Sequence, residues 1–188
     1  PDLDKYDLSS LTRCTVGGQT MSVDKMEEVE SRFGCPLIEL WGMTEIAGVG
    51  TTFPCYGLNK HGSIGMPLPY VEIKIASYED PKQTMPSGEP GELMIRGPIV
   101  MEKYWGKSEA TKETIEPDGW LHTGDVGFMD KDGCVFIVDR MKDMILTAGF
   151  NVYPAEIERV LLKHPKVAMA AVGKVSDDLK GELAHAFI

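Results

Sequence analysis

The spacing of apolar residues changes twice along the chain, and this pattern limits the folds that the chain can adopt. Between residues 22 and 40, apolar residues first recur at helical spacing and then form a short run that favours a strand. In the middle of the chain they alternate with charged residues, as Val71, Ile73 and Ile75 do, which is typical of half-exposed strands. Beyond residue 140 a helical pattern returns. We therefore predict a mixed α/β fold of the α+β kind.

Local signals predict where the elements begin and end. A helix is expected over residues 22–33, with Ser22 as its N-cap and Gly34 at its end. Another helix is expected to begin at Pro154, a favourable first position, and to stop at Pro165. Strands are expected over residues 35–40, 71–75, 91–96, 134–138, 167–172 (of a buried type) and 183–188.

These elements group into successive blocks. Residues 1–61 are expected to form an α/β layer, in which ligands gather beyond the carboxyl ends of the strands. Residues 62–139 are expected to form a small antiparallel β unit. We place a domain boundary near Arg140 to Lys142, so that residues 140–188 belong to a further domain.

Composition excludes several classes of function. Lys and Arg number 19 and Asp and Glu number 29, and the net charge of −10 argues against a nucleic-acid partner. No apolar run approaches eighteen residues, so no transmembrane segment is expected. The four cysteines are far apart in sequence and no histidine completes a zinc motif, which favours reduced thiols in a cytoplasmic protein.

The run Trp41–Glu45 places chemically useful groups directly after a predicted strand. Thr44 can donate a hydrogen bond to a phosphate oxygen, and Glu45 can bind Mg²⁺ when substrate phosphates supply the remaining ligands. The flat side chain of Trp41 can line a nucleotide or acyl pocket. A polar loop with a buried Trp explains these residues equally well, and this alternative stays open.

Other candidate residues lie elsewhere along the chain. The run Gly17–Gly18–Gln19 offers bare backbone that a planar base can approach. Asp125 follows a glycine and can accept hydrogen bonds from both hydroxyls of a ribose. Arg140 can reach a ribose or a phosphate, although a surface salt bridge with Asp139 or Asp143 is an alternative explanation.

The order of these motifs resembles the adenylate-forming (AMP-binding) superfamily, which includes acyl-CoA synthetases, aryl-CoA ligases, luciferases and peptide-synthetase adenylation domains. The resemblance extends from about Gly17 to Ile188. It rests on the runs Trp41–Glu45, Gly91–Gly97, Thr123–Asp125, Asp139–Ile145 and Gly149–Glu158. Trp41 stands where the family usually has a tyrosine.

The resemblance implies a role for each candidate residue. Glu45 would be the metal ligand and Thr44 would contact the α-phosphate, whereas Asp125 and Arg140 would bind the ribose. Lys142 would be the hinge between a large domain that ends at residue 139 and a small domain that begins at residue 140. The remaining residues implied in binding adenine, acyl group or coenzyme A are Gly17, Gly18, Gln19, Glu39, Leu40, Trp41, Gly42, Ile137 and Gly149.

The implied activity is that of an AMP-forming acid–thiol ligase. ATP and Mg²⁺ would activate a carboxylic acid as acyl-adenylate, and coenzyme A would then take the acyl group. The run from Leu146 to Pro154 is more similar to fatty-acyl and related CoA ligases than to peptide-synthetase modules, and the apolar residues near Trp41 favour a medium- or long-chain acid. An aryl-CoA ligase, an adenylation module that serves a carrier protein and a non-catalytic binding fragment remain alternatives.

Two family motifs are not found in the 188 residues. The Ser/Thr/Gly-rich phosphate loop and the catalytic lysine near the C-terminus are both missing. We therefore expect the chain to be part of a longer polypeptide: the C-terminal portion of the large domain and the start of the small one. Alone it is expected to be inactive, and a homodimer is possible.

Overall fold

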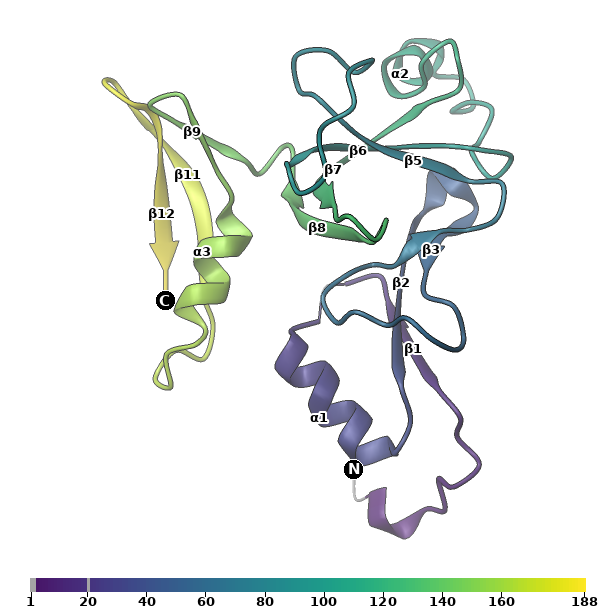
Figure 1. Cartoon of the computed structure of the whole chain (residues 1–188). Helices are drawn as coiled ribbons and strands as arrows, with labels where there is room; N and C mark the ends of the chain where they lie inside the picture. Colours follow the sequence, from purple (N-terminus) through teal and green to yellow (C-terminus); the bar gives the residue numbers. More distant parts are fainter. Residues whose placement is uncertain (1–2, 20) are drawn as a thin grey trace.

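The computed structural model describes residues 3–19 and 21–188, and within these residues the strands form three sheets of four strands each. Figure 1 shows helices packed beside mixed and antiparallel sheets, so the predicted mixed α/β fold is confirmed. Residues 1, 2 and 20, which fall inside the predicted 1–61 layer, lie outside the described part. In that part, no helix combines the length and the apolar character needed to cross a membrane.

The first sheet contains a parallel pair joined by a helix. Its order is β1 (Cys14–Gly17), β2 (Leu37–Met43), β3 (Gly48–Thr52) and β4 (Met66–Pro67), and a short 3-10 turn, η1 (Leu3–Lys5), precedes it. β1 and β2 run parallel, with α1 (Val23–Phe33) between them in sequence, whereas β2, β3 and β4 pair antiparallel. The helix–strand order predicted for this part of the chain is thus confirmed, and β1 and β3 are additions to it.

The helix α1 begins and ends close to the predicted residues. Gly34 adopts the left-handed conformation at the C-cap and its amide donates to the carbonyl of Glu30, as the sequence predicted. At the other end the side chain of Ser22 makes no capping hydrogen bond, so the predicted side-chain cap is wrong. Of the expected apolar stripe only Met26 is fully buried.

The second sheet is the antiparallel unit predicted for the middle of the chain. Its strands pair in sequence order: β5 (Glu72–Ala76), β6 (Gly91–Arg96), β7 (Leu121–Met129) and β8 (Val135–Arg140). A short helix, α2 (Ser108–Thr114), lies between β6 and β7 in sequence. The bounds of β6 are those that the alternation predicted.

The first and second sheets share one core. Ile46, from the 3-10 turn η2 (Thr44–Ile46) that follows β2, packs with buried residues of the second sheet, among them Ile95 and Leu121. Trp41 contacts this cluster and also a neighbouring one around Leu93 and Val135. The end of β2 is therefore fixed against the second sheet, which brings its following turn close to β6 and β7.

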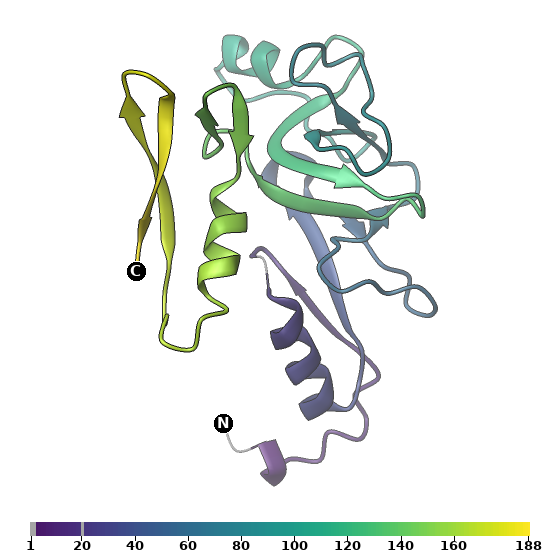
Figure 2. The ribbon, with the colours of Figure 1, turned by 60° about the vertical axis from the view of Figure 1, so that its left-hand side comes forward.

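The third sheet and α3 form a lobe of their own, which both views place beside the β7–β8 end of the second sheet (Figures 1 and 2). The order of its strands is β10 (Phe150–Val152), β9 (Ile145–Thr147), β12 (Gly181–Phe187) and β11 (Ala171–Asp177). The helix α3 (Pro154–Leu161) has Pro154 in its first turn, as predicted.

Two predictions for this lobe are wrong. The helix ends at Leu161, before the proline expected to stop it. The strand predicted over residues 167–172 instead begins at Ala171, where pairing with β12 begins, and it is largely exposed rather than buried.

Polar contacts connect the lobe to the second sheet. The hydroxyls of Tyr78 and Tyr153 lie 3.3 Å apart. The amide of Ala155, in the first turn of α3, donates to Oδ2 of Asp139 on β8 at 3.0 Å. Because Tyr153 makes no side-chain cap of its own, a residue of the neighbouring sheet caps this helix.

Candidate functional site

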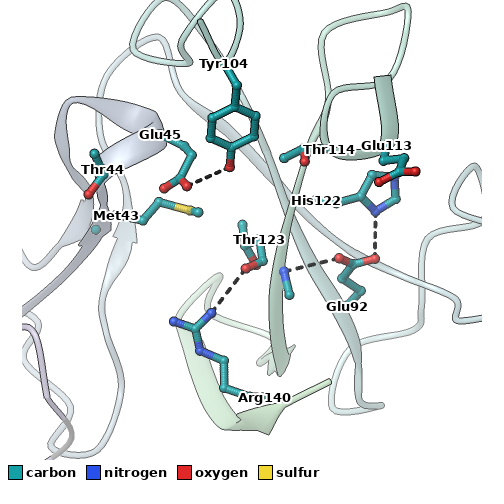
Figure 3. Close-up of a pocket in the computed structure, with 12 residues that line it drawn as sticks. Met43, Thr44, Glu45, Glu92, Tyr104, Glu113, Thr114, His122, Thr123 and Arg140 are labelled. Carbon is teal, nitrogen blue, oxygen red and sulfur yellow. Dashed lines mark hydrogen bonds and ion pairs between the residues drawn. The ribbon is translucent and has the colours of Figure 1, made fainter. Parts of the chain in front are cut away.

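A cavity of about 530 Å³ opens where the end of β2 meets β6, β7 and α2. Figure 3 shows the side chains of Glu45, Tyr104, Glu92 and Arg140 around it. The residues that line it are Gly42, Met43, Thr44, Glu45, Glu92, Tyr104, Glu113, Thr114, His122, Thr123, Gly124 and Arg140. Segments far apart in sequence thus contribute to one wall.

Gly42 allows the chain to turn toward this cavity. A Cβ atom at this position would lie 1.5 Å from the carbonyl oxygen of Gly48, so only glycine fits the approach of β3. The β2–β3 register shifts between Trp41 and Gly42, which marks a bulge. Thr44 and Glu45 follow in a 3-10 turn at the cavity edge. The sequence predicted a polar loop here, and the structure replaces it with a strand end and a tight turn.

Two hydrogen bonds fix Glu45. The hydroxyl of Tyr104 donates to Oε1 of Glu45 at 2.7 Å, and the amide of Met101 donates to the main-chain oxygen of Glu45 at 2.8 Å. The bond to Glu45, followed by burial, raises the pKa of the Tyr104 hydroxyl above its ordinary value. The carboxylate is therefore held in place by the segment between β6 and α2, which sequence reasoning did not connect to it.

Asp125 is almost buried and has a donor at each carboxylate oxygen. Nε1 of Trp41 donates to Oδ2 at 2.9 Å, and Nε of Arg140 lies 2.8 Å from Oδ1. Burial raises the pKa of the Asp125 carboxyl, and the charge of Arg140 and the bond from Trp41 act in the opposite direction. The three residues come from different strands and form one bonded group beside the cavity.

The contacts of this group concern the two alternative explanations given for Arg140 and Trp41. Arg140 forms its ion pair with Asp125 across the β7–β8 ladder, so the alternative of a surface salt bridge with Asp139 or Asp143 is wrong. Trp41 is half-buried and packs against the core, and its Nε1 donates to Asp125, a second candidate residue.

A histidine between two glutamates was missed by sequence reasoning. Nδ1 of His122 lies 2.8 Å from Oε2 of Glu92, and Nε2 lies 3.1 Å from Oε1 of Glu116. Burial opposes a charge on His122, but the bonds to both glutamates outweigh it and raise the pKa of His122 above its ordinary value. Its place directly before Thr123–Asp125 was the available signal.

Several predicted site residues do not line the cavity. Gly17, Gly18 and Gln19 are exposed at and beyond the end of β1. Lys142 is exposed in the turn after β8, and Gly149 lies in the turn between β9 and β10. The other predicted residues outside its lining are Glu39, Leu40, Trp41, Asp125 and Ile137, of which Trp41 and Asp125 connect to it through Arg140.

The residues present suit Mg²⁺ only together with a phosphate-bearing ligand. Among the described residues no three His, Cys, Asp or Glu side chains are grouped to hold a metal ion. Mg²⁺ commonly takes one or two protein carboxylates and obtains its other ligands from substrate phosphates and water. Glu45, at the cavity edge and with only Oε1 in a hydrogen bond, fits this arrangement.

The chain is similar to known proteins over its whole length. The family described as AMP-binding enzyme matches residues 1–105. A long-chain-fatty-acid–CoA ligase of Bacillus subtilis (strain 168) is 39% identical over 188 residues, which are 100% of this chain and 33% of the ligase. The 4-coumarate–CoA ligase 1 of Glycine max is 40% identical over 193 residues, which cover 100% of this chain and 66% of that ligase.

Solved structures show the same arrangement of elements. The o-succinylbenzoate coenzyme A synthetase of Bacillus subtilis, in complex with ATP and magnesium ion, matches with a TM-score of 0.80 at 37% sequence identity. The match covers 95% of this chain and 38% of that one. The chain thus spans about a third of the fatty-acid ligase and 38% of this synthetase.

Proposed function

Because the chain belongs to the family of AMP-binding enzymes, we propose that its cavity binds the adenylate part of ATP and of an acyl-adenylate. The reaction is the ATP-dependent activation of a carboxylic acid, with release of pyrophosphate, followed by transfer of the acyl group to coenzyme A. The observation that carries the proposal is the meeting of Thr44, Glu45 and Arg140 at one cavity, with Asp125 bonded to Arg140.

Each of these side chains has a group suited to part of the nucleotide. The Thr44 hydroxyl donates to an α-phosphate oxygen, and the permanently charged guanidinium of Arg140 attracts the anion. Asp125 accepts hydrogen bonds from the ribose hydroxyls. An ionised carboxylate has about four acceptor sites, so the two donors already present leave capacity for both hydroxyls.

The first step needs alignment and charge stabilisation more than proton transfer. The acid carboxylate attacks the α-phosphorus and pyrophosphate leaves, so negative charge shifts onto phosphate oxygens. Glu45 would hold Mg²⁺, which when bound neutralises part of that charge. Tyr104 keeps the Glu45 carboxylate at the cavity edge and Arg140 orients the nucleotide, so the reacting groups are held in place.

The second step requires access for a thiol. The thiolate attacks the acyl carbon and AMP leaves. We place the large domain before residue 140 and the small one after it, with Lys142 as the hinge. Its exposed position in the turn after β8 supports this placement. Gly149, at a tight turn of the lobe, would meet the coenzyme A arm once the lobe has rotated.

The acid is proposed to be a medium- or long-chain fatty acid, with an aryl acid as the second candidate. Identity to a long-chain-fatty-acid–CoA ligase supports the first, and nearly equal identity to a 4-coumarate–CoA ligase supports the second. Non-hydrolysable adenylate mimics that carry a fatty acyl or an aryl group distinguish them. The class of mimic that binds more tightly identifies the substrate.

Calorimetry with AMP tests the proposed function directly. We expect the chain to bind AMP and expect Asp125→Ala to weaken binding about tenfold or more, because hydrogen bonds to a charged group contribute about 1.5–3 kcal/mol. Asp178→Ala, at an exposed position on the lobe, is the matched control. Absence of AMP binding, or equal affinity of Asp125→Ala and the parent, would favour a non-catalytic interaction role. We also expect no ATP–pyrophosphate exchange by this chain alone.

A further inference from the structure

The pairing of β7 with β6 is interrupted at residues beside the cavity. In the β6–β7 register Glu92 pairs with Val126 and Met94 pairs with His122. Three residues of β7, Thr123 to Asp125, therefore face the single residue Leu93 of β6. Such a bulge loses ladder hydrogen bonds and must be held by other contacts.

Side chains replace the missing ladder bonds. The hydroxyl of Thr123 donates to the carbonyl of Leu93 at 2.6 Å and accepts from the amide of Asp125 at 3.1 Å. The amide of Gly124 donates to Oε1 of Glu92 at 3.3 Å. The orientation of Glu92 thus bears on the position of the bulge, and through it on that of Asp125.

Glu92 is itself oriented by His122. Its other oxygen, Oε2, lies 2.8 Å from Nδ1 of His122, whose Nε2 lies 3.1 Å from Glu116 (Figure 3 shows the Glu92 contact). An ionised carboxylate only accepts hydrogen bonds, and a neutral imidazole has only one N–H. Two such contacts are satisfied together only when His122 is the doubly protonated imidazolium.

We propose that protonated His122 is a positioning residue for nucleotide binding, which holds Glu92 and thereby the Thr123–Asp125 bulge against the ribose. This inference rests on the proposed function of the cavity. His122 need not touch the ligand. It acts through the Glu92 carboxylate and the Gly124 amide on Asp125, which accepts hydrogen bonds from the ribose hydroxyls.

The charged groups around His122 decide the direction of the pH effect. Glu92 faces it from β6 and Glu116 from the segment after α2, and Glu113 of α2 lines the same cavity. On the far side of the bulge, Asp125 is paired with Arg140. The nearest groups are anionic, so the protonated form is held to a higher pH than in a free histidine.

The direction of the pH effect on nucleotide binding follows from the raised pKa of His122. The stabilisation of the bulge is fully present below the ordinary pKa of histidine, about 6.5, and is lost as pH rises through the raised value. Above it His122 has one N–H, and one carboxylate faces an acceptor nitrogen instead of a donor. Adenosine affinity should then fall, by about fivefold if one hydrogen bond of about 1 kcal/mol is lost.

Calorimetry with adenosine from about pH 6 to about pH 9 tests the proposal, because this range crosses the ordinary pKa of histidine. Adenosine carries no phosphate that would titrate in the same range. The parent should lose about fivefold in affinity, whereas His122→Gln should bind weakly at all pH values with a flat profile. His185→Gln, at an exposed position on β12, should keep the profile of the parent.

A second measurement does not depend on a variant that folds. The imidazole ¹⁵N signals of His122 in the parent chain should show that both nitrogens stay protonated to a higher pH than in a free histidine. Adenosine should raise the pKa of His122 further, because linkage is reciprocal. A His122 that loses its second proton at or below the ordinary pKa of histidine, or a pKa that adenosine leaves unchanged, would overturn the inference. A pH-dependent His122→Gln would do the same. Absence of binding of both AMP and adenosine would overturn the proposed function as well.

Discussion

Glu39 tests how much a buried carboxylate oxygen without a hydrogen-bond donor in the described part of the chain destabilises this protein. It lies on β2, and the residue is only 5% exposed. Its Oε2 atom is buried and has no hydrogen-bond donor among the described residues. Burial raises the pKa of the Glu39 carboxyl, and His61 offsets this only in part. Ionisation of Glu39 in the folded chain therefore creates a poorly compensated buried charge, which Glu39→Gln removes with little change of shape.

The expected gain follows from the cost of such a group. A buried polar atom without a partner costs about 1–3 kcal/mol, and more when it is charged. Glutamine remains polar and keeps part of this cost, so we expect the free energy of unfolding to rise by about 1 kcal/mol at neutral pH. For a chain of this size that raises the Tm by about 2–4 °C.

The gain should depend on pH with a definite sign. The pKa of Glu39 is higher in the folded than in the unfolded chain, so its stabilising contribution is complete below the ordinary glutamate pKa. The contribution is lost as pH rises through the raised value. The difference in stability between Glu39→Gln and the parent should therefore be smallest in acid and grow toward neutral pH.

Urea unfolding at a series of pH values measures this difference, with tryptophan fluorescence as the probe because Trp41 lies on the same strand. Glu89→Gln, at an exposed position between β5 and β6, is the matched control and should change stability little at any pH. If Glu39→Gln unfolds more easily than the parent at neutral pH, or if the difference is constant with pH, the assignment of an unpaired buried charge is wrong.

Three further predictions concern the site and the lobe. Mg²⁺ should increase ATP affinity about fivefold less in Tyr104→Phe than in the parent, because a hydrogen bond of about 1 kcal/mol to the proposed metal ligand Glu45 is lost. Calorimetry with and without a chelator measures this difference, and the control Tyr70→Phe should show no change. Gly42→Ala should lower the free energy of unfolding by about 1–3 kcal/mol or more, because the added Cβ would overlap the carbonyl oxygen of Gly48 in the paired strand. An unchanged urea midpoint would contradict this expected loss of stability. Asp139→Ala should speed hydrogen exchange at the Ala155 amide, because removal of a helix cap typically lowers helix stability by about 0.5–2 kcal/mol. Equal exchange rates in the variant and the parent would exclude this cap.

The sequence predicted elements well where local signals act alone. The turn residues around β6 define its bounds, and Gly34 ends α1 because a left-handed residue is needed there. The strand predicted over residues 167–172 failed because its position depends on pairing with β12, and an apolar run does not reveal its partner. The helix α2, which is short and has no fully buried residue, carried no apolar periodicity to find.

In the candidate site, too, residues adjacent in sequence were predicted, whereas contacts between distant residues were not. Thr44 and Glu45 are adjacent in sequence, and their position after a strand predicted a polar loop with candidate functional residues, which the structure shows as a 3-10 turn. Tyr104 and His122 were missed, because their contacts with Glu45 and Glu92 join residues 59 and 30 positions apart in sequence. Such contacts follow from the packing of β2 against the second sheet and from the β6–β7 register, which no local pattern specifies.

The first turn of α3 is capped by Asp139 of the second sheet, so the stability of this helix depends on contact between the lobe and that sheet. Proline supplies no N–H in the first turn, and the next amide, that of Ala155, relies on Asp139 of another sheet. If the lobe swings away, this amide loses its acceptor and the first turn is left free to fray. Unwinding at one helix end would then report, from inside the lobe, that the two parts of the molecule have separated.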